Sequence, residues 1–406
     1  MGKRTSQGAS PAEPKVRKKR RSLLASIIRV LAIALGVFVV LFLIGGWVYS
    51  SDIESGVLAP PTNEPPDYDT TITGVASALA MSTPADTGRA GDEGRMGIEW
   101  PAGYSQTTRL VSSTESDGVV LDVRTLAENA TPPDVGTETR IDNYYWRGDP
   151  TETLDVPYET VFYASNVGSF PAWFIEGTED TWAIIVHGKG GTLDESTRVI
   201  KTFQDLGYPI LIIKYRNDVG EPRDPSGYMQ YGVTEWVDLS AAVRYAQEHG
   251  ATEHVLFGYS YGGAIITSYL TQSPLRNFTK AAILDSPMYN LERTVDYAAS
   301  QTDLPLIPVA VPPLLTEFSK WIASWRFDLN WDDANYLAKS GELHTPTLVF
   351  HGTNDTSVPY ETSRDMQEIR PDITTLVTTS ASHTSSWNLD PEGYDTTIKE
   401  YLESLG

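Results

Sequence analysis

The chain has 406 residues, with 31 Lys and Arg, 53 Asp and Glu, and no Cys, which gives a formal net charge of −22. Without cysteine there are no disulfides, no thiol catalysis and no thiolate metal sites, and the dispersed histidines show no metal-ligand spacing, so we expect neither a metal nor a cofactor. A surface this acidic repels polyanions, which excludes nucleic-acid binding.

The N-terminal region has the pattern of a membrane anchor. Residues 1–29 are basic, and residues 30–49 contain no charge and are long enough to cross a bilayer as a helix. Trp47 and Tyr49 are typical interfacial anchors, and the basic side faces the cytoplasm in most single-pass proteins. We therefore predict a cytoplasmic tail (1–29), a transmembrane helix (30–49) and an extracellular remainder at the cell membrane. A cleaved signal peptide is the alternative, although the apolar run is long for one and no cleavage site follows it promptly.

The next two segments differ from the rest of the chain in composition. Residues 50–96 are rich in Pro, Thr, Asp, Gly and Ser, which predicts an extended linker, with a short helix possible over 71–81. Two alternating runs at 107–113 and 118–125 flank a turn signal and predict a hairpin. We assign them to a small β-containing extension over 97–156.

From residue 157 to the C-terminus, strand and helix patterns alternate. This alternation predicts a mostly parallel sheet with helices on both faces. The predicted strands are 159–164, 170–176, 182–186, 209–214, 254–257, 280–284, 346–350 and 373–378, and the predicted helices are 194–206, 234–249, 262–271, 360–369 and 391–404.

The alternation stops after the sixth strand, in residues 289–343. This insertion is rich in Pro and aromatic residues. At that point in the chain it would cover the carboxyl ends of the strands, so we predict an aromatic cap. The aromatic side chains fit an apolar acyl or aryl pocket, and they fit equally a cap that merely packs on the core.

Gly258–Gly262 reads Gly-Tyr-Ser-Tyr-Gly and lies between an apolar strand and a helix with small residues in its first turn. A G-x-S-x-G at such a turn is typical of a nucleophile elbow, in which glycines permit a strained backbone and the serine hydroxyl is exposed above the sheet. Ser260 is therefore the predicted nucleophile.

His383 is the predicted general base, since it lies in a polar loop directly after a strand. The other histidines fit other roles: packing or turns for His187 and His351, a helix end for His249, and solvated strand boundaries for His254 and His344.

Asp355 is the predicted carboxylate that orients the base, on the loop that leaves the preceding strand. Asp285 is the rival, although an aspartate ahead of Ser-Pro also suits a turn. Asp390 and Glu392 follow His383 so closely that a helix cap explains them better.

Two backbone N–H groups are the predicted oxyanion-hole donors. One belongs to Tyr261, the residue after the nucleophile, and the other to Lys189 in the glycine-rich loop His187–Gly191. An ordinary strand-to-helix turn would explain the same loop. A phosphate-binding loop would not, because the G-x-x-x-x-G-K-[ST] pattern is absent.

Four motifs in this order resemble the α/β-hydrolase superfamily from about Pro157 onward: His187-Gly188, Gly258–Gly263, His351–Pro359 and His383. The chain is most similar to the serine-aminopeptidase-like and monoglyceride-lipase-like branch and to bacterial membrane-anchored hydrolases. The resemblance implies the α/β-hydrolase fold and a Ser-Asp-His triad, and it leaves the substrate open.

These features together predict a membrane-anchored extracellular serine hydrolase that cleaves carboxylic esters through an acyl-enzyme. Its partners would be a small-molecule acyl substrate, an ester or short peptide, and the membrane itself. Two alternatives stay open. One is a peptidase of the aminopeptidase-like kind, and the other is a non-catalytic surface protein that keeps the scaffold as a binding platform.

Overall fold

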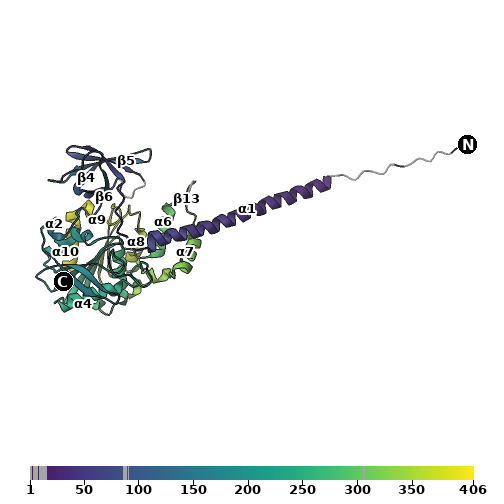
Figure 1. Ribbon diagram of the computed structural model, residues 1–406. Coiled ribbons are helices and arrows are strands. Elements are labelled where there is room, and N and C mark those ends of the chain that lie inside the picture. The colour runs from purple at the N-terminus through teal and green to yellow at the C-terminus, as the bar shows by residue number, and fades with distance from the viewer. Residues whose placement is uncertain (1, 3–7, 9–15, 86–88, 90, 305–306) are drawn as a thin grey trace.

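A computed structural model describes residues 2, 8, 16–85, 89, 91–304 and 307–406 (Figure 1). It contains a long N-terminal helix, a small β-barrel and an α/β domain. The helix projects from the body, and the barrel lies on the α/β domain (Figure 1).

Helix α1 (Val16–Asp52) contains the predicted span 30–49. Within the described residues, the segment Leu23–Leu58 is long and apolar enough to cross a membrane, a property that a signal sequence shares. The chain continues directly into a π-helical turn, η1 (Ile53–Leu58), whose Ile53 and Leu58 are buried in the core of the α/β domain. The interpretation of these six residues as extended linker is therefore wrong.

The barrel is a closed six-stranded sheet in the order β1-β2-β5-β4-β3-β6. Its strands are β1 (Thr70–Val75), β2 (Ala78–Pro84), β3 (Met96–Trp100), β4 (Gly103–Ser116), β5 (Val119–Leu126) and β6 (Glu138–Asp142). The predicted hairpin at 107–113 and 118–125 is part of the β4–β5 pair.

The predicted linker is wrong from Thr70 onward, and the predicted short helix at 71–81 is also wrong. Instead, β1 and β2 close the barrel. Ile72, Leu79 and Met81 alternate with exposed or half-buried neighbours and are almost completely buried in its core. This period of two is the strand pattern, and it is easily overlooked among so many Thr, Ser and Ala residues.

The α/β domain is built on an eight-stranded sheet in the order β16-β15-β12-β11-β9-β10-β8-β7. Its strands are β7 (Glu159–Ala164), β8 (Ser169–Ile175), β9 (Thr181–Val186), β10 (Ile210–Ile213), β11 (Glu253–Tyr259), β12 (Thr279–Asp285), β15 (Thr347–Gly352) and β16 (Thr374–Thr379). The six strands β16, β15, β12, β11, β9 and β10 are parallel to one another. Strand β8 is antiparallel to β10, and β7 is antiparallel to β8. The predicted mostly parallel sheet is thus confirmed.

Helices cover both faces of this sheet, as expected from the alternation. They are α2 (Pro150–Leu154), α3 (Thr197–Asp205), α4 (Trp236–Glu248), α5 (Tyr261–Gln272), α8 (Glu361–Ile369), α9 (Ser386–Leu389) and α10 (Pro391–Ser404). Neighbouring residues of one strand enter different cores: Ile184 packs with α4 and α5 on one face, and Ile185 packs with α3 and α10 on the other. Because both faces are buried, the central strands are continuously apolar.

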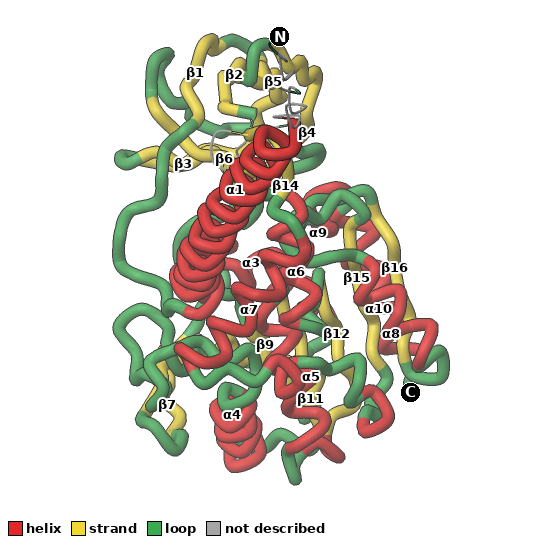
Figure 2. Tube along the Cα trace, turned by 90° about the vertical axis from the view of Figure 1, so that its right-hand side faces the viewer, coloured by secondary structure: helices red, strands yellow, loops and turns green. Residues whose placement is uncertain are grey.

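The predicted cap corresponds to the insertion between β12 and β15. It contains α6 (Leu291–Gln301), β13 (Asp303–Leu304), β14 (Ile307–Ala310), α7 (Pro313–Phe327) and the 3₁₀ turns η4 (Trp331–Ala334) and η5 (Ser340–Glu342). Helices α6 and α7 lie on the side of the domain from which α1 projects, and α7 packs against α1 (Figures 1 and 2).

Candidate active site

Ser260 sits at a sharp turn between β11 and α5. Its backbone has φ +48° and ψ −108°, a conformation that costs a non-glycine residue about 1–3 kcal/mol. The turn is held because the Ser260 N–H donates to the Asp285 carbonyl at 2.8 Å. A Cβ on Gly262 would meet the Val186 carbonyl oxygen at 2.2 Å, so only glycine lets the turn approach β9. The local sequence therefore forces the strained elbow.

The side chains of Ser260, Asp355 and His383 are far apart in the sequence, and the structure brings them together. The Ser260 hydroxyl lies 2.8 Å from Nε2 of His383. Nδ1 of the same imidazole lies 2.7 Å from Oδ2 of Asp355. The serine and the carboxylate therefore contact opposite nitrogens of one ring, the arrangement that lets an imidazole accept a proton on one side while it is oriented from the other.

Asp355 is held as a carboxylate by its surroundings. The residue is 1% exposed, and its Oδ1 accepts the N–H groups of Ser357 and Val358, each at 2.8 Å. Although burial raises the pKa of Asp355, the charge of His383 and the hydrogen bonds from His351 and His383 outweigh burial and hold it well below the usual range. The Asp355 carboxyl group thus stays ionised.

The rival carboxylate Asp285 is engaged elsewhere. It is the fully buried last residue of β12, and its carboxyl group accepts hydrogen bonds from Tyr394 at 3.1 Å and Ser286 at 3.2 Å. Burial raises its pKa to about 6. Asp390 caps α10 by accepting the N–H of Gly393, as the sequence suggested.

The remaining histidines mostly follow the predictions. His249 is the C-cap of α4, and His351 is buried within β15, where its Nε2 lies 3.2 Å from the Val358 carbonyl. The sequence did not reveal that His351 Nε2 also lies 3.2 Å from Asp355. The interpretation of His254 as solvated is wrong: it lies inside β11, is fully buried, and contacts the Thr279 hydroxyl at 2.8 Å. Burial lowers its pKa to about 3.

The loop after β9 lies against the elbow. The Gly188 backbone lies so close that a Cβ there would meet the Ser260 Cβ at 3.6 Å. Tyr261 is the first residue of α5, where a helix leaves its N–H groups without intrahelical partners. The two predicted donor residues, Tyr261 and Lys189, both line the cavity that contains Ser260.

Three residues that sequence reasoning missed hold this loop in place. Glu195 Oε2 accepts the Gly188 N–H at 2.8 Å, and the Tyr215 hydroxyl donates to the Gly188 carbonyl at 3.1 Å. Asp218 contacts His187 Nε2 at 2.9 Å. Burial lowers the pKa of His187, but the Asp218 carboxylate outweighs burial and raises it. The only sequence signal for these roles was a cluster of polar residues after β9 and β10.

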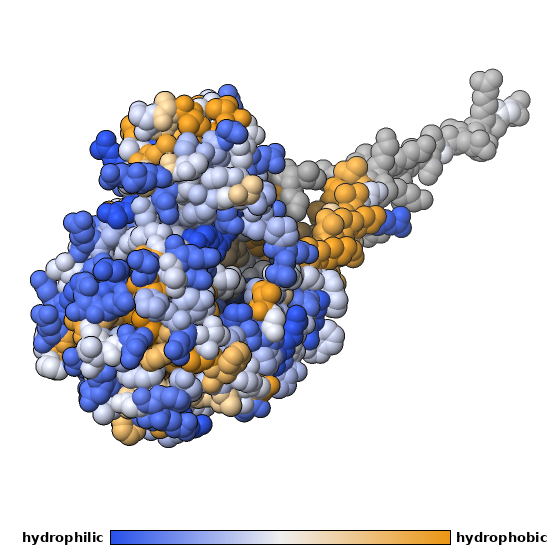
Figure 3. All heavy atoms as spheres, turned by 60° about the vertical axis from the view of Figure 1, so that its left-hand side comes forward, coloured by the Kyte–Doolittle hydropathy of each residue, from blue (hydrophilic) through white to orange (hydrophobic). Residues whose placement is uncertain are grey.

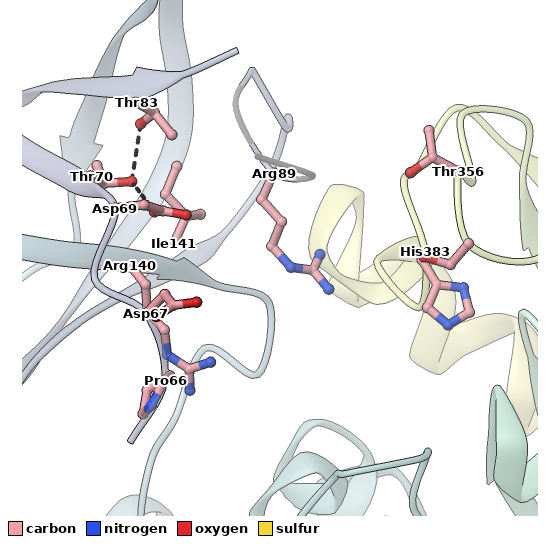
Figure 4. A pocket seen from close by; sticks show the side chains of 11 residues that line it. Pro66, Asp67, Asp69, Thr70, Thr83, Arg89, Arg140, Ile141, Thr356 and His383 are labelled. Carbon is pink, nitrogen blue, oxygen red and sulfur yellow. Dashed lines mark hydrogen bonds between the residues drawn. The ribbon is translucent and has the colours of Figure 1, made fainter. Parts of the chain in front are cut away.

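A cavity of about 440 Å³ opens onto Ser260 and His383. The cap contributes an apolar wall of Met288, Leu291, Val295 and Ala298, and η1 contributes Gly56 and Val57. A more polar space adjoins it on the barrel side, where Arg89 points toward the loop that carries His383 (Figure 4). Among the described residues, no group of His, Asp and Glu could hold a metal ion.

Comparisons with known proteins bear on the fold. A model of the prolyl oligopeptidase family matches residues 195–369, a segment that contains Ser260 and Asp355 and ends before His383. The esterase Pf2001 of Pyrococcus furiosus is similar in structure, with a TM-score of 0.51 and 21% identity over 64% of this chain and 97% of that one. An acylaminoacyl peptidase of Pyrococcus horikoshii has a TM-score of 0.46 and 15% identity, over 82% of this chain and 62% of that one. No curated protein matches the chain.

The sheet topology and the family match over residues 195–369 support a serine hydrolase of the α/β type. The chain has the α/β-hydrolase fold.

Proposed function

We propose that the protein is a carboxylesterase in which Ser260 is the nucleophile, His383 the general base and Asp355 the group that orients it. The observation that carries this proposal is the continuous chain of contacts Ser260–His383–Asp355, at 2.8 and 2.7 Å. General-base catalysis requires the imidazole to lie within hydrogen-bond distance of both the serine hydroxyl and the carboxylate, and these two distances meet that requirement.

The reaction follows from these positions. As the Ser260 oxygen attacks the ester carbonyl, its proton passes to His383 Nε2, and the imidazolium is stabilised by the Asp355 carboxylate. The N–H groups of Tyr261 and Lys189 stabilise the oxyanion. His383 then gives the proton to the leaving alcohol. Water, deprotonated by the same imidazole, releases the acid from the acyl-enzyme and restores Ser260.

Membrane anchoring is the second part of the proposal. The apolar helix α1, the nine basic residues of segment 1–29 and the interfacial Trp47 support a single-pass protein whose N-terminus is cytoplasmic. The barrel and the hydrolase domain are then extracellular. Mapping protease accessibility on intact cells tests this topology, since both domains should be cleaved without lysis.

An amide hydrolase is the second candidate, favoured by the match to the prolyl oligopeptidase family. Esters fit the cavity better. Its apolar wall suits an acyl group. Among the described residues that line it, the one carboxylate that would suit a substrate amine is Glu195, which is bound to Gly188 and lies 3.6 Å from Arg198.

A panel of acyl esters and aminoacyl amides, assayed with the full-length protein in detergent, separates the two candidates. The carboxylesterase proposal expects higher kcat/KM on esters and the loss of all turnover in Ser260→Ala. A clear preference for amides would overturn it in favour of the peptidase.

A further inference from the structure

A second cavity, of about 310 Å³, lies between the end of α1, η1 and the cap helices α6 and α7. It shares four lining residues with the catalytic cavity: Gly56, Val57, Val295 and Ala298. The two cavities therefore adjoin, and we call the pair the groove: its second cavity lies at the end of α1, and its catalytic cavity lies at the candidate nucleophile. Among the described residues that line the second cavity, Asp52 is the single charged one.

Helix α7 is in direct contact with the part of α1 that would lie in the bilayer. Phe318 stacks on Phe42 with ring centroids 5.1 Å apart, and a Cβ on Gly46 would meet the Phe318 ring at 2.3 Å. Near the other end of α7, the Arg326 guanidinium lies 4.4 Å from the centre of the Trp47 ring. If Trp47 marks the membrane interface, Phe42 lies about 7.5 Å deeper along the helix, and Phe318 reaches the same depth.

The outer face of α7 is apolar and exposed. Leu314, Trp321 and Trp325 are 71%, 66% and 74% exposed, and their spacing puts them with Phe318 on one helical stripe. Large apolar side chains gathered in this way mark an interaction surface. Figure 3 shows that the apolar surface of α1 continues outward from a body that is otherwise mostly polar. Because Phe318 stacks on Phe42, the stripe is next to the proposed membrane span.

We infer that α7 lies in the outer leaflet interface and that the groove receives the acyl chain of a bilayer ester lipid, which reaches Ser260 without crossing water. This inference rests on the proposed esterase function and on the anchoring of α1. It names the substrate class: long-chain acyl esters resident in the membrane. The chain occupies the apolar groove, and its ester carbonyl lies at Ser260. The bond between the acyl carbon and the alkoxy oxygen breaks, and water supplies the hydroxyl of the fatty acid and the proton of the alcohol.

The test uses the full-length protein in dioleoylphosphatidylcholine vesicles. Two fluorogenic substrates with the same leaving group are compared, a membrane-resident oleoyl ester and a soluble butyryl ester. Rates are divided by the fraction of protein labelled by a fluorophosphonate, so that misfolded molecules do not count.

Ala299→Phe narrows the second cavity at a residue that does not line the catalytic one. We expect the ratio of oleoyl to butyryl rates to fall about tenfold, equivalent to about 1.4 kcal/mol of differential binding. The matched control is Ser300→Phe, the next residue on α6, which is exposed and lines neither cavity. An unchanged ratio in Ala299→Phe, or an equal fall in Ser300→Phe, overturns the groove as the acyl site.

Trp325→Glu tests whether the ester lipid enters the groove directly from the bilayer on which α7 docks. We expect a slower rate on the oleoyl ester in vesicles and a smaller loss when the same ester is presented in detergent micelles. Phe162→Glu is the control, since Phe162 is a 63% exposed aromatic on β7, away from α7. Equal losses in vesicles and micelles, or none in either, overturn the proposed docking of α7 on the bilayer.

The wild-type protein separates this inference from the function on which it rests. If it hydrolyses the butyryl ester but not the oleoyl ester in either form, the lipid inference fails and the esterase stands. If it hydrolyses neither ester and Ser260 is not labelled, the esterase proposal itself fails.

Discussion

The Lys189 side chain donates a hydrogen bond to the backbone carbonyl of Val57, at 2.7 Å, across 132 positions of the chain. A second bond, at 2.6 Å, goes to the Gly56 carbonyl. The candidate oxyanion loop is thus tied to η1, the six residues that follow the apolar helix, and η1 forms part of the wall of the site.

Replacing Lys189 by Met is expected to release η1 while leaving the backbone donor of residue 189 in place. We expect faster proteolysis within residues 53–58 and a kcat/KM on a soluble ester about tenfold lower, since two charge-assisted hydrogen bonds are lost. The control is Lys399→Met, which breaks a surface ion pair with Asp205. If Lys189→Met behaves like this control, the side chain has no role in positioning the loop.

The two buried carboxylates near the site should differ sharply in their effect on catalysis. Asp355→Asn removes the charge that orients His383, and we expect kcat to fall by a factor on the order of 10⁴, as for comparable triads. Asp285→Asn should lower kcat less than about tenfold, because its carboxyl group bonds Tyr394 and Ser286 rather than the imidazole. Steady-state kinetics on a soluble ester measure both effects. A larger loss of kcat in Asp285→Asn than in Asp355→Asn would show that Asp285 is the orienting residue.

Asp285 should instead influence how stability depends on pH. Its folded-state pKa of about 6 lies above the value of about 3.9 for an unfolded chain. Between these values the folded protein keeps a proton that the unfolded chain has released, so this residue stabilises the fold most below pH 4 and less as the pH rises to 6. The effect is roughly 2–3 kcal/mol.

Thermal unfolding of the wild type and Asp285→Asn at pH 4 and at pH 6 measures this contribution. The wild-type Tm should fall more than that of the variant over this interval. Parallel changes in the two proteins would show that Asp285 does not titrate there.

Gly46 is expected to be essential for the contact between α1 and α7. Gly46→Val would drive its side chain into Phe318, and overpacking of this kind typically costs about 1–3 kcal/mol. We expect a lower Tm in detergent and faster proteolysis of α7. Gly36→Val is the matched control on the same helix, where a Cβ meets nothing within 4 Å. Equal Tm values for the two variants would contradict the packing of α7 on the span.

Much of the hydrolase domain could be predicted because its signals are local. Each central strand is a short apolar run, and Ser260 lies in a pentapeptide whose glycines are required by contacts at the elbow. His383 and Asp355 follow strand ends, and parallel strands bring their carboxyl ends to one edge of a sheet. The order of the motifs along the chain therefore sufficed to nominate all three.

The rest depends on contacts between distant segments. The β1 and β2 strands look like linker by composition, and only closure of the barrel with β5 and β6 gives Ile72 and Leu79 a core. Likewise, η1 carries no motif; it lines the site because Leu58 is buried in the core of a domain whose strands begin a hundred residues later. The burial of His254 depends on β12, which no pattern near that histidine reveals.

The most direct test of the Ser260–His383–Asp355 site is to identify the residue that a fluorophosphonate modifies in the full-length protein by mass spectrometry. We predict a single adduct on Ser260, absent in Ser260→Ala and strongly slowed in His383→Ala. An adduct on a different residue, or a folded protein that reacts with no probe, would contradict the proposed catalytic role of this site.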